Sequence, residues 1–132
     1  MYLKTPIFVE VAPGELIDKI TILEIKLKHI KDEEKLVNVR LELETLVKAR
    51  DLSISPTDAL DSLGAELKSA NEALWKIEDK IRESERKKEF NSDFVRLARS
   101  VYITNDKRAA LKREINELLG SSLIEEKSYS SY

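Results

Sequence analysis

Apolar residues recur at alternating steps of three and four along most of this chain, and this spacing constrains the fold more than any other feature. Such steps keep apolar side chains on one face of an α-helix, whereas a half-buried strand alternates every second residue. The spacing therefore predicts an all-α protein with coiled-coil-like packing. The longest run comprises Leu60, Leu63, Leu67, Ala70, Leu74, Ile77 and Ile81.

Breaks in the spacing divide the chain into four predicted helices. The apolar phase of residues 16–30 does not continue after Lys35, which favours a turn with Asp32 as the N-cap over one bent helix across residues 14–51. Ser55 is predicted to be the N-cap of the third helix, with Pro56 in its first turn. The first two helices therefore form a hairpin.

The last helix has a start signal and a stop signal of its own. Asn91 or Ser92 is predicted to cap it, and Gly120 is predicted to end it. Its apolar seam contains two polar residues, Thr104 and Arg108. A second stripe on this helix indicates that it contacts two neighbours, and consists of Val95, Ala98, Tyr102, Asn105 and Ala109.

These elements predict one helical domain over residues 1–132. We expect an extended arm at 1–13, a first helical hairpin at 14–51, a linker at 52–56, a long second hairpin at 57–120 and a tail at 121–132. The two antiparallel hairpins form an elongated four-helix bundle. Residues 6–11, PIFVEV, predict a short strand or arm. A lone strand needs a partner, which a second copy can supply.

The composition excludes several kinds of chemistry. The chain has no Cys and a single His, His29, so neither a thiolate zinc site nor a histidine-based zinc or di-iron site can be assembled. We expect no cofactor and no metal. The absence of Cys, of a signal peptide and of a long apolar run leads us to expect a cytoplasmic protein without a membrane span.

Charge is distributed unevenly along the chain. Residues 76–113 hold twelve Lys or Arg and seven Asp or Glu, so this segment carries +5 while the whole chain carries −2. Such a segment suits an anion site, or a contact between parts of the fold or between subunits. Aromatic residues do not alternate with the basic residues, so the pattern does not favour nucleic acid.

Folding the predicted helices up and down gathers polar residues into one groove. The first and fourth helices then place Glu24 near Arg108 and Asp18 near Asn116, and the turn near residue 90 brings Glu78 level with Tyr102. Two interpretations follow: a pocket for an anionic small molecule, or a buried polar layer in which Glu24 or Glu78 neutralises Arg108. The predicted groove comprises Asp18, Glu24, Glu78, Arg82, Tyr102, Asn105, Arg108, Lys112 and Asn116.

Two carboxylate pairs and one aromatic residue need separate consideration. Glu15 with Asp18, and Glu114 with Glu117, have the spacing of helical magnesium-dependent nucleotide pyrophosphatases, but the second pair falls on outer positions. Trp75 lies beside the seam of the third helix and is interpreted as a packing anchor. Neither observation assigns catalytic residues.

Several segments resemble a bacterial and phage family described only as a domain of unknown function. The segments are GELIDKITILEIK, KLVNVRLELETL, LWKIEDKIRESE and LARSVYITNDKRAALKREIN. The resemblance implies a small helical protein and no assigned activity. A weaker resemblance of residues 15–30 to helical chorismate mutases implies a basic pocket made of Arg40, Arg82, Arg108 and Lys112.

The sequence thus predicts a non-enzymatic binding or scaffolding protein. We expect a homodimer formed through the first helix and the arm, with a protein partner or an anionic small molecule as its ligand. The alternative is a small helical enzyme or ligand-binding protein for an anionic metabolite, related in chemistry to chorismate mutases or magnesium-dependent nucleotide-processing enzymes.

Overall fold

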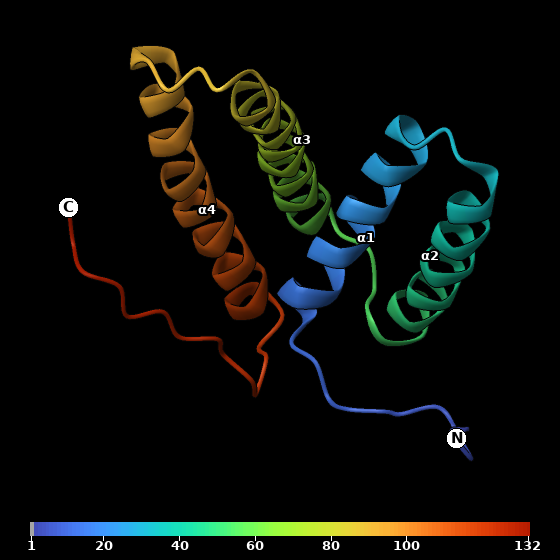
Figure 1. Ribbon diagram of the computed structural model, residues 1–132. Coiled ribbons are helices and arrows are strands. Elements are labelled where there is room, and N and C mark those ends of the chain that lie inside the picture. Colours follow the sequence, from blue (N-terminus) through green and yellow to red (C-terminus); the bar gives the residue numbers. More distant parts are fainter. Residues whose placement is uncertain (1) are drawn as a thin grey trace.

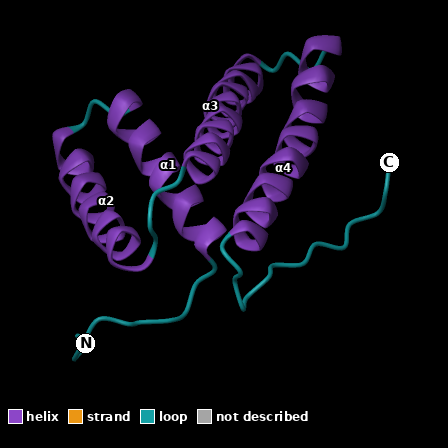
Figure 2. Ribbon diagram, turned by 180° about the vertical axis from the view of Figure 1, so that it is seen from behind, coloured by secondary structure: helices purple, strands orange, loops and turns teal. Residues whose placement is uncertain are grey.

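The computed structural model describes residues 2–132 and contains four α-helices. These are α1 (Pro13–His29), α2 (Glu33–Ser53), α3 (Asp58–Lys87) and α4 (Ser92–Leu118). Figures 1 and 2 show two antiparallel hairpins, α1 with α2 and α3 with α4. The all-α, four-helix prediction is confirmed. The described part of the arm, residues 2–12, contains no strand and runs as an extended segment.

Side-chain caps set most helix boundaries. Asp32 accepts a hydrogen bond from the backbone N–H of Glu34, so the predicted turn between α1 and α2 is present and the bent-helix alternative is wrong. Asn91 caps α4 as predicted, by accepting from two backbone N–H groups. The prediction of Ser55 as the cap of α3 is wrong, because the Thr57 hydroxyl accepts the hydrogen bond from Leu60 N.

The first helix is the centre of the molecule. It packs against α2 on one side and against both α3 and α4 on the other, while α2 has no contacts with α3 or α4. In Figure 1, α1 crosses from the base of α4 past α3, and α2 lies outside it. Most apolar residues of α1 are thus buried within one chain, whereas Ile22 and Leu27 are half-buried. The expectation that this helix takes part in a dimer contact stays a prediction.

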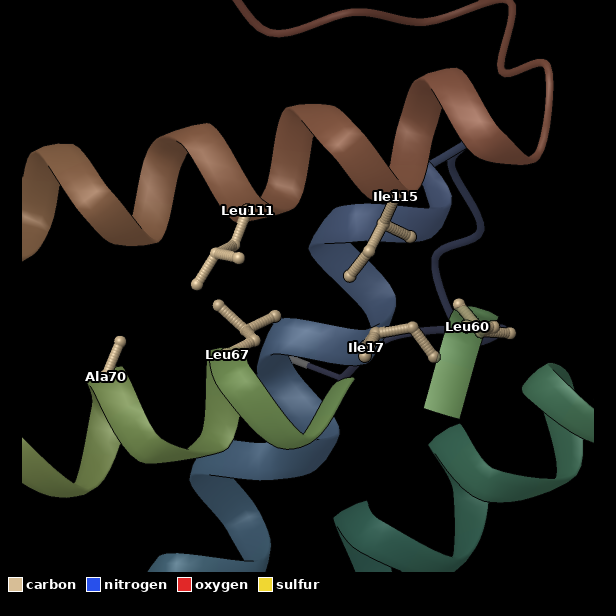
Figure 3. Packing of buried hydrophobic residues seen from close by; sticks show 6 residues of the cluster. All are labelled: Ile17, Leu60, Leu67, Ala70, Leu111 and Ile115. Atoms are coloured by element: carbon tan, nitrogen blue, oxygen red, sulfur yellow. The ribbon is translucent and has the colours of Figure 1, made fainter. Parts of the chain in front are cut away.

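The core lies where α1 crosses the lower part of the α3–α4 hairpin. Leu67 and Ile115 are completely buried there, and Ile17 of α1 lies between the two helices (Figure 3). Leu119, in the turn after α4, is half-buried and packs against this core. This packing holds α1, α3 and α4 together at the base of the hairpin. The core cluster consists of Ile17, Leu60, Leu67, Ala70, Leu111 and Ile115.

The outer half of the α3–α4 hairpin has no third helix upon it. Between Glu72 on α3 and Ala110 on α4, no residue is buried, although the seam residues are half-buried. Figure 1 shows this half rising beyond α1 to the connecting turn at residues 88–91. Apolar side chains of the arm are also exposed, and Phe8 retains 88% of its accessible surface. The molecule therefore presents two uncovered apolar surfaces.

Candidate functional site

A buried carboxylate lies where α1 meets α3 and α4. Asp18 is 1% exposed, and its two oxygens accept hydrogen bonds from Nε and Nη2 of Arg108, at 3.0 and 2.5 Å. Asn71 of α3 donates to Asp18 Oδ1 at 2.8 Å and to the Thr21 hydroxyl at 2.9 Å. The Thr21 hydroxyl in turn donates to the Asp18 carbonyl. One carboxylate thus joins three helices.

Lys112 extends this cluster toward the start of α1. Its Nζ lies 2.6 Å from a Glu15 oxygen, 3.8 Å from Asp18 Oδ2 and 3.5 Å from a Glu125 oxygen. Only 13% of the Lys112 side chain is exposed. Two cations therefore face three carboxylates from α1 and the tail, which offsets the cost of desolvating Asp18.

The pKa values of the cluster reflect this balance. Burial by itself raises the pKa of Asp18, but hydrogen bonds from Arg108 and Asn71 and the charges of Arg108 and Lys112 hold it below its usual value. Burial likewise opposes the charged form of Lys112, yet its bond to Glu15 and the surrounding carboxylates raise its pKa. The Asp18 bond also raises the pKa of Arg108. All three groups are stabilised in their charged forms.

The start of α1 rests directly on α4. Ala12 provides no side-chain cap, and the backbone N–H of Gly14 instead donates to the Asn116 side chain at 2.7 Å. A Cβ atom on Gly14 would lie 2.3 Å from the Lys112 carbonyl oxygen. Only glycine permits this approach, so Gly14 and Asn116 fix the level at which α1 meets α4.

The position of α1 along α4 differs from the predicted position by about one helical turn. Asn116 lies opposite Gly14 and not Asp18, and Asp18 lies opposite Arg108 and Lys112. The predicted neutralisation of Arg108 by Glu24 or Glu78 is therefore wrong, because Asp18 performs it.

The structure brings together only part of the predicted groove. Asp18, Arg108, Lys112 and Asn116 belong to one cluster, and Asn105 Oδ1 lies 3.5 Å from Arg108 Nη1. Glu24 is elsewhere: it pairs with Lys68 at 3.7 Å.

The three remaining groove residues lie farther toward the hairpin turn or against the tail. Glu78 pairs with Arg82 within α3. Tyr102 contacts the Tyr132 ring edge-on, with centroids 5.2 Å apart. Glu78 and Arg82 nevertheless line one open groove with Asn105 and Arg108, so part of the predicted groove is formed.

Three residues of the cluster were missed from the sequence, Thr21, Asn71 and Glu125, and Glu15 was considered only as a carboxylate pair with Asp18. Asn71 could have been found, because it precedes Trp75 by four residues and so continues the stripe of Trp75, Glu78 and Arg82 one turn back. Glu125 lies in the tail, where helical periodicity gives no information.

An open groove of about 480 Å³ adjoins the cluster between α1, α3 and α4. Its lining includes Ile22 and Ile25 of α1, Trp75, Glu78 and Arg82 of α3, and Asn105 and Arg108 of α4. Trp75 also stacks on the His29 ring at 5.1 Å, while Nε2 of His29 lies 3.3 Å from a Glu72 oxygen. Trp75 is thus a packing residue between α1 and α3.

The residues implied by the chorismate mutase resemblance do not converge. Arg40 lies on the outer helix α2, where its nearest partner is Glu33 at 3.6 Å, and α2 has no contact with α3 or α4. Glu117 of the second carboxylate pair faces Arg113. Within residues 2–132, no three His, Cys, Asp or Glu side chains are arranged to hold a metal ion.

The C-terminal tail runs back along α4. Glu126 pairs with Arg113 at 3.1 Å, and the Tyr132 hydroxyl donates to Asp106 at 2.5 Å. The bond to Asp106 raises the pKa of Tyr132. Because these contacts are exposed, they hold the tail weakly.

Comparisons with known proteins identify the family of this chain but no individual related protein. No helix within residues 2–132 has the length and hydropathy needed to span a membrane. Neither the curated proteins nor the solved structures include a match to this chain. Residues 7–132 match a family of unknown function, DUF6165. The match covers nearly the whole chain, which therefore belongs to the DUF6165 family.

Proposed function

We propose that this protein is a non-enzymatic binding or scaffolding module that works as a homodimer in the cytoplasm. Its buried polar cluster holds the helices in register, and its uncovered apolar surfaces make the contacts with other chains. The observation that carries the proposal is the contrast between a polar cluster with complete internal bonding and an arm whose apolar side chains Ile7, Phe8 and Val9 remain exposed.

The bonding of the polar cluster supports an architectural role. Both oxygens of Asp18 are occupied by Arg108 and Asn71, and no buried side-chain N or O atom within residues 2–132 lacks a partner. An anionic ligand would have to compete with Asp18 and Glu15 for the same cations. A charge pair that joins helices far apart in sequence fixes their relative position.

The arm supports self-association. Residues 6–11 form an extended segment in which most residues are β-branched or aromatic. All six residues are exposed. Ile7, Phe8 and Val9 each retain over 70% of their accessible surface. An extended apolar segment with unpaired backbone groups is suited to pair with the same segment of a second copy.

Self-association is tested by light scattering coupled to size-exclusion chromatography at tens of micromolar protein. We expect the mass of a dimer, against 15.2 kDa for one chain. Phe8→Ser should weaken the dimer, whereas Tyr2→Ser, on an equally exposed residue outside the 6–11 segment, should not. A monomer mass for the unaltered protein would contradict self-association.

The metabolite-binding alternative is tested by a thermal-shift screen with phosphorylated, carboxylated and nucleotide compounds, with and without magnesium. We expect no saturable shift. A stabilisation of about 2 kcal/mol by one class, corresponding to a ligand at tens of times its Kd, would contradict the architectural role of the cluster. Loss of that shift in Arg108→Met, with helicity retained, would place the ligand at Arg108.

A further inference from the structure

A second open groove, of about 450 Å³, lies between α1, the end of α2 and the first half of α3. Its apolar lining includes Ile17 and Ile20 of α1, Ile54 of the linker, and Leu60, Gly64 and Ala65 of α3. The groove is open because α2 packs on α1 and has no contacts with α3. None of the arm residues 2–12 or tail residues 121–132 lines it, so neither terminal segment covers this surface.

Gly64 lies in this groove, and neither the backbone nor the packing of the chain requires glycine there. It follows the first residue of α3 by six positions, and its φ is not left-handed. A Cβ at Gly64 would meet a single neighbouring atom within 4 Å, Ile17 Cγ2 at 3.9 Å. Glycine inside a helix is unfavourable, because it loses more conformational freedom on folding than other residues. Space for a bulky side chain that enters the groove from outside the chain accounts for a glycine at this position.

The arm is an apolar segment that its own chain leaves uncovered. Ile7, Phe8 and Val9 are 76%, 88% and 73% exposed. Glu10 accepts a hydrogen bond from the Ser122 hydroxyl, which holds the base of the arm beside the end of α4, and Figure 1 shows the arm extending away from the helices. Two arms paired only with each other would form a two-stranded ribbon, which is marginally stable in water. Stable association through the arm therefore needs an apolar surface that buries its side chains.

We infer that the arm of a second copy binds in this groove, and that two copies exchange their arms about a two-fold axis. The partner's Phe8 lies over Gly64 and Ala65, where small residues leave room for an aromatic ring. Successive side chains of an extended segment point to opposite sides, so the partner's Ile7 and the partner's Val9 face α1. The inference rests on the proposed self-association and names the surface that receives the arm.

The groove and the arm agree in length and in chemistry. The groove follows α3 from Leu60 to Lys68, a rise of about 12 Å, and residues 5–9 of the arm span about 13 Å when extended. Residues 5–9 carry no charge, which suits an apolar groove.

A second copy is the occupant because one chain presents both halves of the contact and leaves both uncovered. The arm is exposed in its own chain and does not line its own groove. Exchange of arms covers both arms and both grooves at once, in a closed assembly of two chains. This kind of exchange adds no new element to the fold, since each arm only changes the chain against which it lies.

The test alters the groove and the arm in separate full-length variants, Gly64→Leu and Phe8→Ser. Leucine at position 64 fills the space that the partner's Phe8 would occupy, and Phe8→Ser removes the ring itself. For each variant we expect light scattering at about 20 μM to show a monomer and Kd to rise about tenfold or more. Helicity by circular dichroism should be retained in Gly64→Leu, because leucine is the better helix former and the first atom of its side chain has room.

Two alanines of α3 provide a second groove variant and its matched control. Ala65 and Ala73 are both exposed, but only Ala65 lines the groove. Ala65→Leu should raise the Kd of the dimer, whereas Ala73→Leu, the same change on the same helix, should leave it unaltered. Equal Kd values for the two variants would contradict binding in the groove, even if Gly64→Leu failed to fold.

Mixing Gly64→Leu with Phe8→Ser tests the exchange itself. In the mixed pair, the unaltered arm of the Gly64→Leu chain meets the unaltered groove of the Phe8→Ser chain, so one of the two contacts is restored. We expect a heterodimer with a Kd between that of the unaltered protein and those of the single variants. Two monomeric variants that do not combine overturn the exchange of arms.

The remaining outcomes separate the groove from self-association. A dimer that persists in both Gly64→Leu and Ala65→Leu overturns the groove and leaves pairing between arms as the contact. A monomeric unaltered protein overturns both the groove contact and the proposed self-association.

Discussion

Two glycines of this protein stand in opposite environments. A Cβ on Gly14 would lie 2.3 Å from the backbone oxygen of Lys112, whereas a Cβ on Gly64 would lie 3.9 Å from Ile17 Cγ2, an ordinary contact. We therefore expect Gly14→Ala to lower the free energy of unfolding by about 2–3 kcal/mol, because α1 must move away from α4. Gly64→Ala should raise it by about 0.5–1 kcal/mol, because glycine is unfavourable inside a helix.

Urea unfolding followed by circular dichroism measures both glycine variants. The pair is informative because the substitution is the same and only the surroundings differ. Equal effects of the two variants would contradict the close approach of α1 to α4 at Gly14.

The buried carboxylate should make stability depend on pH in acid. The pKa of Asp18 is lowered in the folded protein, so its ionised form contributes stability that is present above the unfolded pKa, about 4, and is lost as pH falls through the folded value. Asp18→Asn should cost about 3 kcal/mol near pH 7, because it leaves Arg108 without its carboxylate partner. The difference between the two proteins should shrink toward pH 2, and a constant difference would contradict this pKa.

The four helices differ in how many neighbours hold them. Only Leu36 and Val39 are buried in α2, and α1 is its sole neighbour, whereas α1 is held by three helices. We expect α2 to open at a lower free energy than α1. Native-state hydrogen exchange should show weaker protection of α2 amides than of α1 amides. Equal protection of the two helices would mean that they unfold as one unit.

The elements themselves could be predicted from the sequence, but their relative positions could not. The seam of α3 and the caps Asp32 and Asn91 depend on residues close in sequence, and local spacing determines them. Ser55 and Thr57 both offer a capping hydroxyl, and the local pattern did not distinguish them, whereas the structure uses Thr57.

The candidate site was less predictable because it depends on how helices slide past one another. Arg108 was expected to meet Glu24 or Glu78, yet it meets Asp18. A displacement of one turn along the axes of α1 and α4 is enough to change every partner. That displacement is set by Gly14 against the α4 backbone, a contact that periodicity does not encode.

At the scale of the whole molecule, a dimer links stability to concentration. If the chains associate only when folded, Tm should rise as protein concentration increases, because association removes folded monomer from the unfolding equilibrium. Differential scanning calorimetry from about 5 to 200 μM measures the effect. The variant Phe8→Ser should show a smaller rise, and a concentration-independent Tm in the unaltered protein would contradict dimerisation.

The central position of α1 has a consequence for the order in which the protein can fold during synthesis. Among the four helices α1 leaves the ribosome first, but its partners Arg108, Lys112 and Asn116 follow it by about ninety residues or more. Until α4 has been made, α2 alone can cover α1, and only on one side. The charge of Asp18 stays in water during this interval. Translation of α4 is therefore the step that allows the core to close, and a ribosome stalled before it would hold a chain with an uncovered first helix.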